Sequence, residues 1–177
     1  MLAGEPFLAD DPELLAERRR ARGRCAALNA TPDEDALARA PILAQLLGAI
    51  GDGSEIVSPF QCDYGYRISI GARSFLNFGA VILDSATVRI GDDVQIGPNV
   101  QLVTAVHPLE PKRRRTHVEW GEPIVIADDV WLAAGVIVCA GVAIGAGSVV
   151  GAGSVVTRDL PARHLCVGSP CRPLRAL

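Results

Sequence analysis

Apolar residues recur at every sixth position through most of the second half of the chain. The series comprises Ile90, Ile96, Leu102, Ile126, Leu132, Val138, Ile144, Val150 and Val156. A period of six matches neither the 3.6-residue turn of an α-helix nor the simple alternation of a surface strand. It is typical of short parallel strands that are joined by tight corners around a triangular coil, with three hexads in each turn. Residues 18 positions apart, such as Ile126 and Ile144, should therefore stack.

The positions that follow these apolar residues are mostly small, as tight corners require. They are Gly91, Gly97, Ala127, Ala133, Cys139, Gly145, Gly151 and Thr157. Leu102 and Ile126 are 24 residues apart, which is a multiple of six, so the segment 105–123 is expected to leave the coil as a loop and return in phase. This segment is too charged for a rung and long enough to overhang a site.

An earlier series, Ile70, Leu76, Ile82 and Val88, is also spaced by six but is offset by two residues from Ile90. A slip is therefore expected between Thr87 and Ile90, and the spacing alone does not say where the two residues are absorbed. A mixed α/β domain whose strands happen to repeat is the alternative, and the number of positions that keep phase argues against it.

Two helices are predicted ahead of the coil. The first runs from Asp11 to about Ala30 with an amphipathic pattern, and the second follows a capping sequence, Thr-Pro-Asp-Glu, at 31–34. Gly48–Gly53 is expected to end the second helix. The predicted organisation is a helical cap, a coil with its loop at 105–123, and a C-terminal extension, at residues 1–56, 57–160 and 161–177 respectively.

Composition narrows the function classes. A net charge of −3 and a pI of about 5.6 lack the basic footprint of a nucleic-acid-binding domain. No apolar run approaches the roughly 18 residues of a membrane helix, and the N-terminus lacks the pattern of a signal peptide, so a cytoplasmic protein is expected. The five cysteines include no Cys-x-x-Cys pair, so neither a disulfide framework nor a zinc site is indicated.

Several short motifs carry a family resemblance. They are Asp-Tyr-Gly-Tyr at 63–66, Asn-Phe at 77–78, Thr-Ala-Val-His-Pro-Leu at 104–109 and Gly-Ser-Pro-Cys-Arg-Pro-Leu-Arg at 168–175. With the hexads, they resemble the maltose and galactoside O-acetyltransferases, to which the rhizobial nodulation acetyltransferase is similar. The resemblance implies an all-β fold, a left-handed parallel β-helix of hexapeptide repeats with a small N-terminal α-helical cap. It also implies acetyl-CoA as donor and a homotrimer with active sites between subunits.

Acetyl transfer to a hydroxyl needs a general base, because an alcohol is a weak nucleophile until its proton is removed. Histidine suits this role near neutral pH. His107 stands where the hexads break off and matches the family's catalytic histidine, whereas His117 and His164 are interpreted as structural.

The resemblance also implies binding residues. Those for the sugar acceptor are Arg18, Asp63, Asn77 and Glu119, and Glu119 could instead orient His107. Those for acetyl-CoA are Trp131, Ala134, Ala152, Thr157, Arg158, Arg172 and Arg175. The Ala134 N–H is a candidate oxyanion donor, and no metal is expected. The chain departs from the galactoside enzymes at Ser85, where an acidic residue is expected, and at Gly79, which weakens a preference for galactosides.

Other functions stay open at this point. A related acetyltransferase with a non-sugar acceptor, such as an amino sugar, an antibiotic or an amino acid, would share the same coil and donor. A non-catalytic coil, or a hydratase that binds zinc through three histidines from adjacent turns, is the alternative from another class. In that case metal analysis would find stoichiometric zinc.

Overall fold

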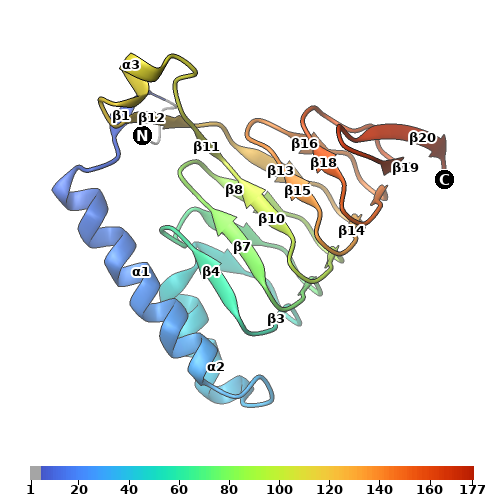
Figure 1. Ribbon diagram of the computed structural model, residues 1–177. Helices are drawn as coiled ribbons and strands as arrows, with labels where there is room; N and C mark the ends of the chain where they lie inside the picture. Colours follow the sequence, from blue (N-terminus) through green and yellow to red (C-terminus); the bar gives the residue numbers. More distant parts are fainter. Residues whose placement is uncertain (1–4) are drawn as a thin grey trace.

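The computed structural model describes residues 5–177, which form a parallel β-helix with two helices across its N-terminal end (Figure 1). Residues 1–4 of the predicted cap lie outside the described residues. The predicted β-helix with N-terminal helices is confirmed. In the part of the chain that is described, no helix is both long and apolar enough to cross a membrane.

The coil has three faces, each a sheet of parallel strands. The first face contains β2 (Ala49–Ile50), β5 (Ile68–Ile70), β8 (Val88–Ile90), β13 (Ile124–Ile126) and β16 (Ala143–Ile144). The second contains β3 (Glu55–Ile56), β6 (Phe75–Leu76), β9 (Gln95–Ile96), β14 (Trp131–Leu132), β17 (Val149–Val150) and β19 (His164–Val167), with β20 (Arg172–Ala176) antiparallel at its edge. The third contains β4 (Phe60–Cys62), β7 (Ala80–Leu83), β10 (Gln101–Val103), β15 (Ile137–Val138) and β18 (Val155–Val156).

Two corners of this triangle matter for the site. The corner between the second and third faces, made by residues 77–79, 97–99, 133–135 and 151–153, is termed the narrow corner. The corner that follows the third face, made by residues 63–67, 84–87, 104–123, 139–142 and those after β18, is termed the insertion corner.

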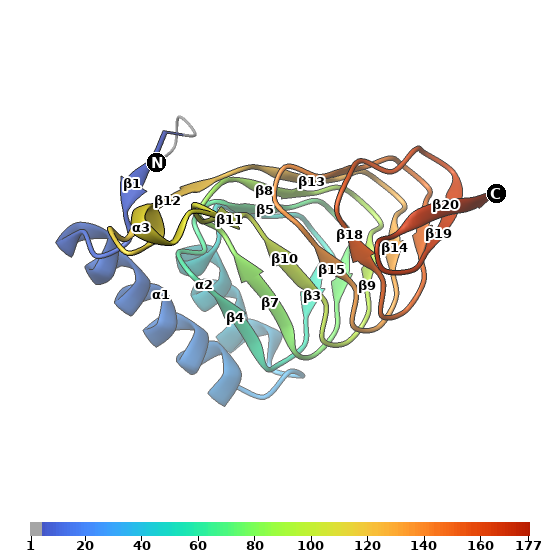
Figure 2. The same ribbon diagram turned by 45° about the horizontal axis from the view of Figure 1, so that its top comes forward.

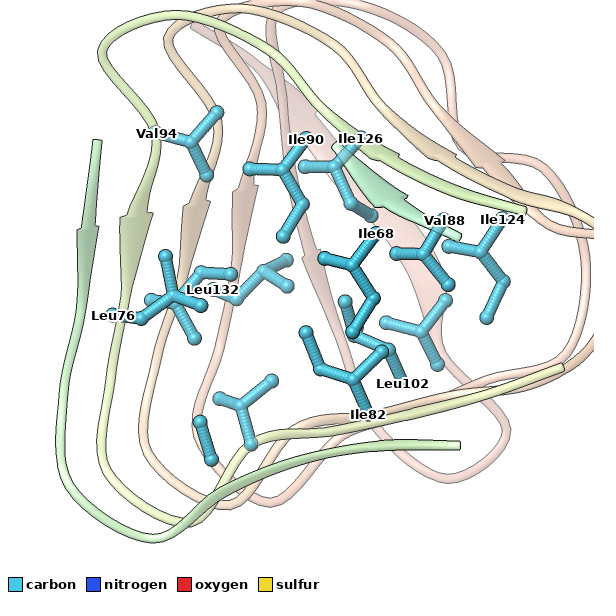
Figure 3. Close-up of a cluster of buried hydrophobic side chains, with 14 of the residues drawn as sticks. Ile68, Leu76, Ile82, Val88, Ile90, Val94, Leu102, Ile124, Ile126 and Leu132 are labelled. Atoms are coloured by element: carbon cyan, nitrogen blue, oxygen red, sulfur yellow. The ribbon is translucent and has the colours of Figure 1, made fainter. Parts of the chain in front are cut away.

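The hexad residues fill the axis of the coil, as Figure 3 shows for Ile90, Leu102, Ile126 and Leu132. Ile126 pairs with Ile144, so the predicted stacking of residues 18 apart is confirmed. Burial of these aliphatic side chains is the main stabilising contribution in so thin a core.

The apparent slip near Ile90 is a longer corner. Strands before the loop pair at a spacing of 20 residues, as Ile70 does with Ile90 and Ile82 with Leu102. The two extra residues fall at the insertion corner in each of these turns. Val88 keeps the six-residue spacing only because β8 buries two side chains, and Val88 stacks in a second column with Ile68 and Ile124 (Figure 3).

The coil also begins earlier than the sequence suggested. β2 and β3 already pair in parallel with β5 and β6, so the first rung starts at Ala49 and not at residue 57. Gly48 permits this close approach, because a Cβ there would collide with the carbonyl oxygen of Tyr66. The hexad positions of this turn are Ile50, Ile56 and Cys62, a short series offset by two residues from Ile70, which is too little to recognise.

The cap consists of α1 (Pro12–Ala30) and α2 (Ala36–Leu46). Asp11 caps α1 by accepting the N–H groups of Glu13 and Leu14. The prediction that residues 31–34 cap the second helix is wrong, since Thr31 is instead the C-cap of α1 and Asp35 caps α2. The buried side chains that pack the helices onto the open end of the coil are Ala21, Cys25, Leu28, Leu43 and Leu46.

The segment predicted as a loop is a hairpin with a helical tip. β11 (Ala105–Val106) and β12 (Val118–Gly121) pair antiparallel, and α3 (Pro111–Arg114) lies between them. The outer edge of β12 pairs with β1 (Phe7–Leu8), so the N-terminal strand holds the hairpin beside the start of α1 (Figure 2).

Candidate active site

The hairpin places His107 opposite Glu119. Val106 pairs with Trp120, so the next residues outward on the two strands, His107 and Glu119, face each other. His107 Nε2 lies 3.6 Å from Glu119 Oε2, a distance that makes an ion pair when the imidazole is protonated. The His107 side chain is 55% exposed and that of Glu119 only 10%, so the imidazole faces solvent with a buried carboxylate behind it.

Burial governs the charge state of Glu119. It raises the pKa of the carboxyl group, because an ionised carboxylate loses solvation in this position, while the positive charges of His107 and Arg18 act in the opposite direction. A carboxylate in this setting favours a cation beside it. It is therefore suited to hold the imidazole in one orientation and to stabilise its protonated form.

Arg18 reaches this region from α1. Its Nη1 donates to the hydroxyl of Tyr64 at 2.7 Å, and its Nη2 donates to the carbonyl of Ala9. Its guanidinium also lies 5.7 Å from the centre of the Tyr64 ring. Arg18 thus links the cap helix, the N-terminal strand and the insertion corner.

Asp63 follows β4 directly at the same corner. Partial burial raises the pKa of its carboxyl group, and Arg18, Arg22 and Arg67 oppose that rise. The charge of Asp63 also raises the pKa of Glu119, which indicates that the two groups interact. The structure therefore brings together four of the predicted site residues, Arg18, Asp63, His107 and Glu119.

Asn77, which is predicted to bind the acceptor, does not lie at the insertion corner of its own chain. It borders a shallow pocket of about 350 Å³ at the narrow corner, together with Trp131 and Ala134. A face of six residues is roughly 20 Å long at about 3.3 Å per residue. Asn77 is therefore separated from His107 of the same chain by the width of a face, and lies with two predicted acetyl-CoA residues.

The other predicted acetyl-CoA residues are divided between three places. Ala152 lies one turn beyond Ala134 at the narrow corner, where the N–H of Gly153 donates to the Ala134 carbonyl at 2.9 Å. Thr157 and Arg158 are exposed and follow β18 at the insertion corner. Arg172 and Arg175 lie on β20 at the C-terminal end of the coil.

Two residues of the insertion corner were not predicted from the sequence. Tyr64 is buried and receives the Arg18 hydrogen bond, and the Arg67 guanidinium lies 4.5 Å from the Tyr64 ring centre. Arg67 also donates to the carbonyl of Ser85 at 2.7 Å. The signal that could have found them is the lengthened corner, since both belong to the segment that holds the extra residues.

The two other histidines make local contacts. His117 Nδ1 lies 3.0 Å from Asp10 Oδ2 at the outer end of the β1–β12 pair, and His164 Nδ1 lies 2.8 Å from the carbonyl of Ala162. Ser85, where the galactoside enzymes were expected to differ, is buried beneath Gly121 of the hairpin.

Comparison with known proteins shows which family has this sequence and fold. The chain matches the maltose acetyltransferase hexapeptide capping motif at residues 1–51 and the bacterial transferase hexapeptide (six repeats) at residues 123–158. Nodulation protein L of Rhizobium meliloti (strain 1021) is 47% identical over 97% of this chain and 94% of its own length.

Two solved structures are similar over nearly the whole chain. A maltose O-acetyltransferase from Clostridium difficile 630 has a TM-score of 0.97 and 39% identity, covering 99% of this chain and 94% of its own. A hexapeptide-repeat acetyltransferase from Vibrio cholerae O1 biovar eltor, in complex with acetyl coenzyme A, has a TM-score of 0.93 and 42% identity, covering 100% and 96%.

Proposed function

The chain belongs to the maltose and galactoside O-acetyltransferase family of hexapeptide-repeat enzymes, and on this premise we propose that it acetylates a hydroxyl group of a sugar. It is an acetyltransferase, and its donor is acetyl coenzyme A. The observation that carries the proposal is the pairing of exposed His107 with buried Glu119 at the corner where the coil opens.

His107 acts as the general base in this proposal. The imidazole of His107 accepts the proton of the acceptor hydroxyl as the oxygen attacks the thioester carbonyl, and Glu119, which faces Nε2, stabilises the imidazolium that forms. The tetrahedral intermediate then expels the coenzyme A thiolate, which takes the proton back from His107. Transfer is direct, with the Ala134 N–H as the proposed donor to the oxyanion.

The site is formed between two chains. The base lies at the insertion corner, whereas Asn77, Trp131 and Ala134 lie at the narrow corner, about 20 Å away by the length of a face. A threefold arrangement would bring the narrow corner of one chain beside the insertion corner of its neighbour. This separation supports a homotrimer with intersubunit sites.

Donor binding uses both corners and the C-terminal end. Small residues such as Ala152 leave backbone groups accessible to the pantetheine amides, and Thr157 adds a hydroxyl. Arg158, Arg172 and Arg175 offer charge-assisted hydrogen bonds to the coenzyme A phosphates.

The acceptor meets Arg18 and Asp63, whose forked groups suit the hydroxyls of a sugar. Ser85 is buried beneath Gly121 of the hairpin, so it does not contact the acceptor in its own chain.

The test is a His107→Ala variant assayed by release of coenzyme A thiol with maltose, glucose, a galactoside, glucosamine and serine as acceptors. We expect kcat on the best acceptor to fall by about 10²–10⁴-fold, the usual contribution of a positioned base. Full turnover by the variant would refute the role of His107. A wild-type enzyme that acetylates only serine or the amine of glucosamine would refute the sugar hydroxyl as acceptor.

A further inference from the structure

Asp84 is a buried acid that the proposed reaction does not use. It follows β7 at the insertion corner, and its side chain is fully buried. Burial raises the pKa of its carboxyl group, which means that ionising it inside the protein is costly. A buried carboxylate is tolerated only where hydrogen bonds or an opposite charge satisfy its oxygens.

The oxygens of Asp84 receive three successive backbone N–H groups from the turn below. Oδ1 accepts from Asp63 at 3.1 Å and from Tyr64 at 2.8 Å, and Oδ2 accepts from Gly65 at 2.7 Å. Consecutive N–H groups that converge in this way form an anion-binding concavity. Here the anion is the protein's own carboxylate. Gly65 has a φ of +81°, a conformation that a residue with a side chain rarely adopts.

The turn that Asp84 holds carries the acceptor side of the site. Asp63 is its first residue, and the Tyr64 hydroxyl accepts the hydrogen bond from Arg18. A displacement of the turn would therefore move Asp63 and break the hydrogen bond between Tyr64 and Arg18, while His107 and Glu119, which lie on the hairpin, would keep their pairing.

In the next turn of the coil, a neutral side chain makes the hydrogen bonds that hold the backbone of the insertion corner. Because Cys62 pairs with Ile82 and Ile82 with Leu102, Asp84 and Thr104 are two residues beyond equivalent positions. Thr104 Oγ1 accepts the N–H of Ala86 at 2.8 Å and donates to the Leu83 carbonyl at 2.7 Å. A neutral hydroxyl thus suffices to close this corner, so the carboxylate at Asp84 serves more than closure.

We propose that Asp84 is a positioning residue for the acceptor, holding residues 63–65 so that Asp63 and Arg18 meet the sugar. The inference rests on the proposed function, since it concerns the acceptor of that reaction. It concerns the acceptor alone and leaves the donor groove untouched.

Asp84→Asn tests this, because the amide keeps the shape but turns one acceptor oxygen into a donor that faces N–H groups. We expect the KM for the sugar acceptor, maltose or glucose, to rise about tenfold or more, as for the loss of a charge-assisted hydrogen bond. The KM for acetyl-CoA should stay within about twofold of wild type. An unchanged acceptor KM, or an equal rise in both KM values, would overturn the proposal.

Two further variants keep the test decisive. Asp84→Thr copies the solution found at Thr104, so it should fold even if Asp84→Asn does not, and it should show the same rise in acceptor KM. Asp128→Asn is the control for the substitution itself. The exposed Asp128 accepts one backbone N–H, that of Asp92 at 2.9 Å, at a different corner, and both KM values should stay unchanged.

A double-mutant cycle with Tyr64→Phe tests whether Asp84 acts on the acceptor through Tyr64 and Arg18. If Asp84 acts through Tyr64 and Arg18, the effects of Asp84→Thr and Tyr64→Phe on acceptor KM should be less than additive. Full additivity would overturn this route. A wild-type enzyme that fails to acetylate any sugar defeats the proposed function instead, so the two failures are distinguishable.

Discussion

At the scale of single residues, Glu119 combines two conflicting properties. Its carboxylate supports His107, yet its burial makes the ionised form costly. Function and stability should therefore respond in opposite directions to removal of its charge.

Glu119→Gln should lower kcat about 10²-fold through loss of the support for His107. Burial raises the folded pKa of Glu119 above 4.5, so its contribution to stability is present below that value and is lost as the pH rises through the folded pKa. The free energy of unfolding of the variant, relative to wild type, should thus increase from about pH 4.5 towards neutrality. Urea unfolding across this range measures it.

A variant that is destabilised more strongly at neutral than at acid pH would contradict this account of Glu119. Steady-state kinetics on the same preparations provide the internal control, because a loss of kcat without loss of stability separates support of the base from folding.

The six-residue spacing and the short motifs explain which site residues could be predicted from the sequence. His107 was found because it stands at the end of a regular series and within a recognisable motif. Tyr64 and Asp84 were not, because they lie in two lengthened corners, 63–67 and 84–87. Each corner is followed by a second buried residue, Ile68 or Val88, that keeps the six-residue spacing and conceals the extra length. The sequence did not reveal that Asn77 occupies the narrow corner, and its role in acceptor binding stays a prediction.

At the scale of elements, the hairpin β11–β12 determines where the base lies. Its return strand passes so close to the corner below that Gly121 has no room for a side chain. A Cβ at this position would lie 2.7 Å from the carbonyl carbon of Ser85 and 2.8 Å from the Cβ of Ala86.

Gly121→Ala should therefore push β12 away from the corner and misplace Glu119 and His107. A shift of this kind, of about 1 Å, can cost about 10²-fold in kcat. Thiol-release kinetics measure the effect, and circular dichroism checks that the coil remains folded.

Gly23→Ala is the matched control for this substitution. Gly23 lies in α1, and a Cβ added there would have no neighbouring atom within 4 Å, so alanine should raise the free energy of unfolding by about 0.5–1 kcal/mol and leave kcat unchanged. Equal activity of the two variants would show that the hairpin tolerates displacement.

The sequence predicted that a segment leaves the coil after Leu102, but not how it is secured. The pairing of β1 with β12 joins residues more than 100 positions apart through strands of two to four residues. No periodicity is visible in so short a strand, so this contact could be found only in three dimensions.

At the scale of the whole molecule, the separation of the two corners makes a prediction about mixed oligomers. His107→Ala subunits lack the base but keep the narrow corner, and Trp131→Ala subunits have the reverse defect. Equal mixing with random association should restore about a quarter of the wild-type rate, because a quarter of neighbouring pairs would join two intact corners. Thiol release after co-expression measures it.

A mixture no more active than the average of the two pure variants would contradict a site shared between chains. Sedimentation of the wild-type enzyme provides the independent check, since an active monomer is incompatible with the same arrangement.

The helical cap has a consequence beyond support of Arg18. The first and last turns of a parallel β-helix each have an edge of unpaired backbone N–H and C=O groups. If uncovered, such an edge can pair with the strands of another molecule, as in a fibril. α1 and α2 lay Leu28 and Leu46 over one end, while β20, which contains Pro173, closes the other in antiparallel fashion. The helices thus cap the β-helix and prevent end-to-end association of its strands with those of another molecule. A chain that lost them to proteolysis would become the seed of a filament.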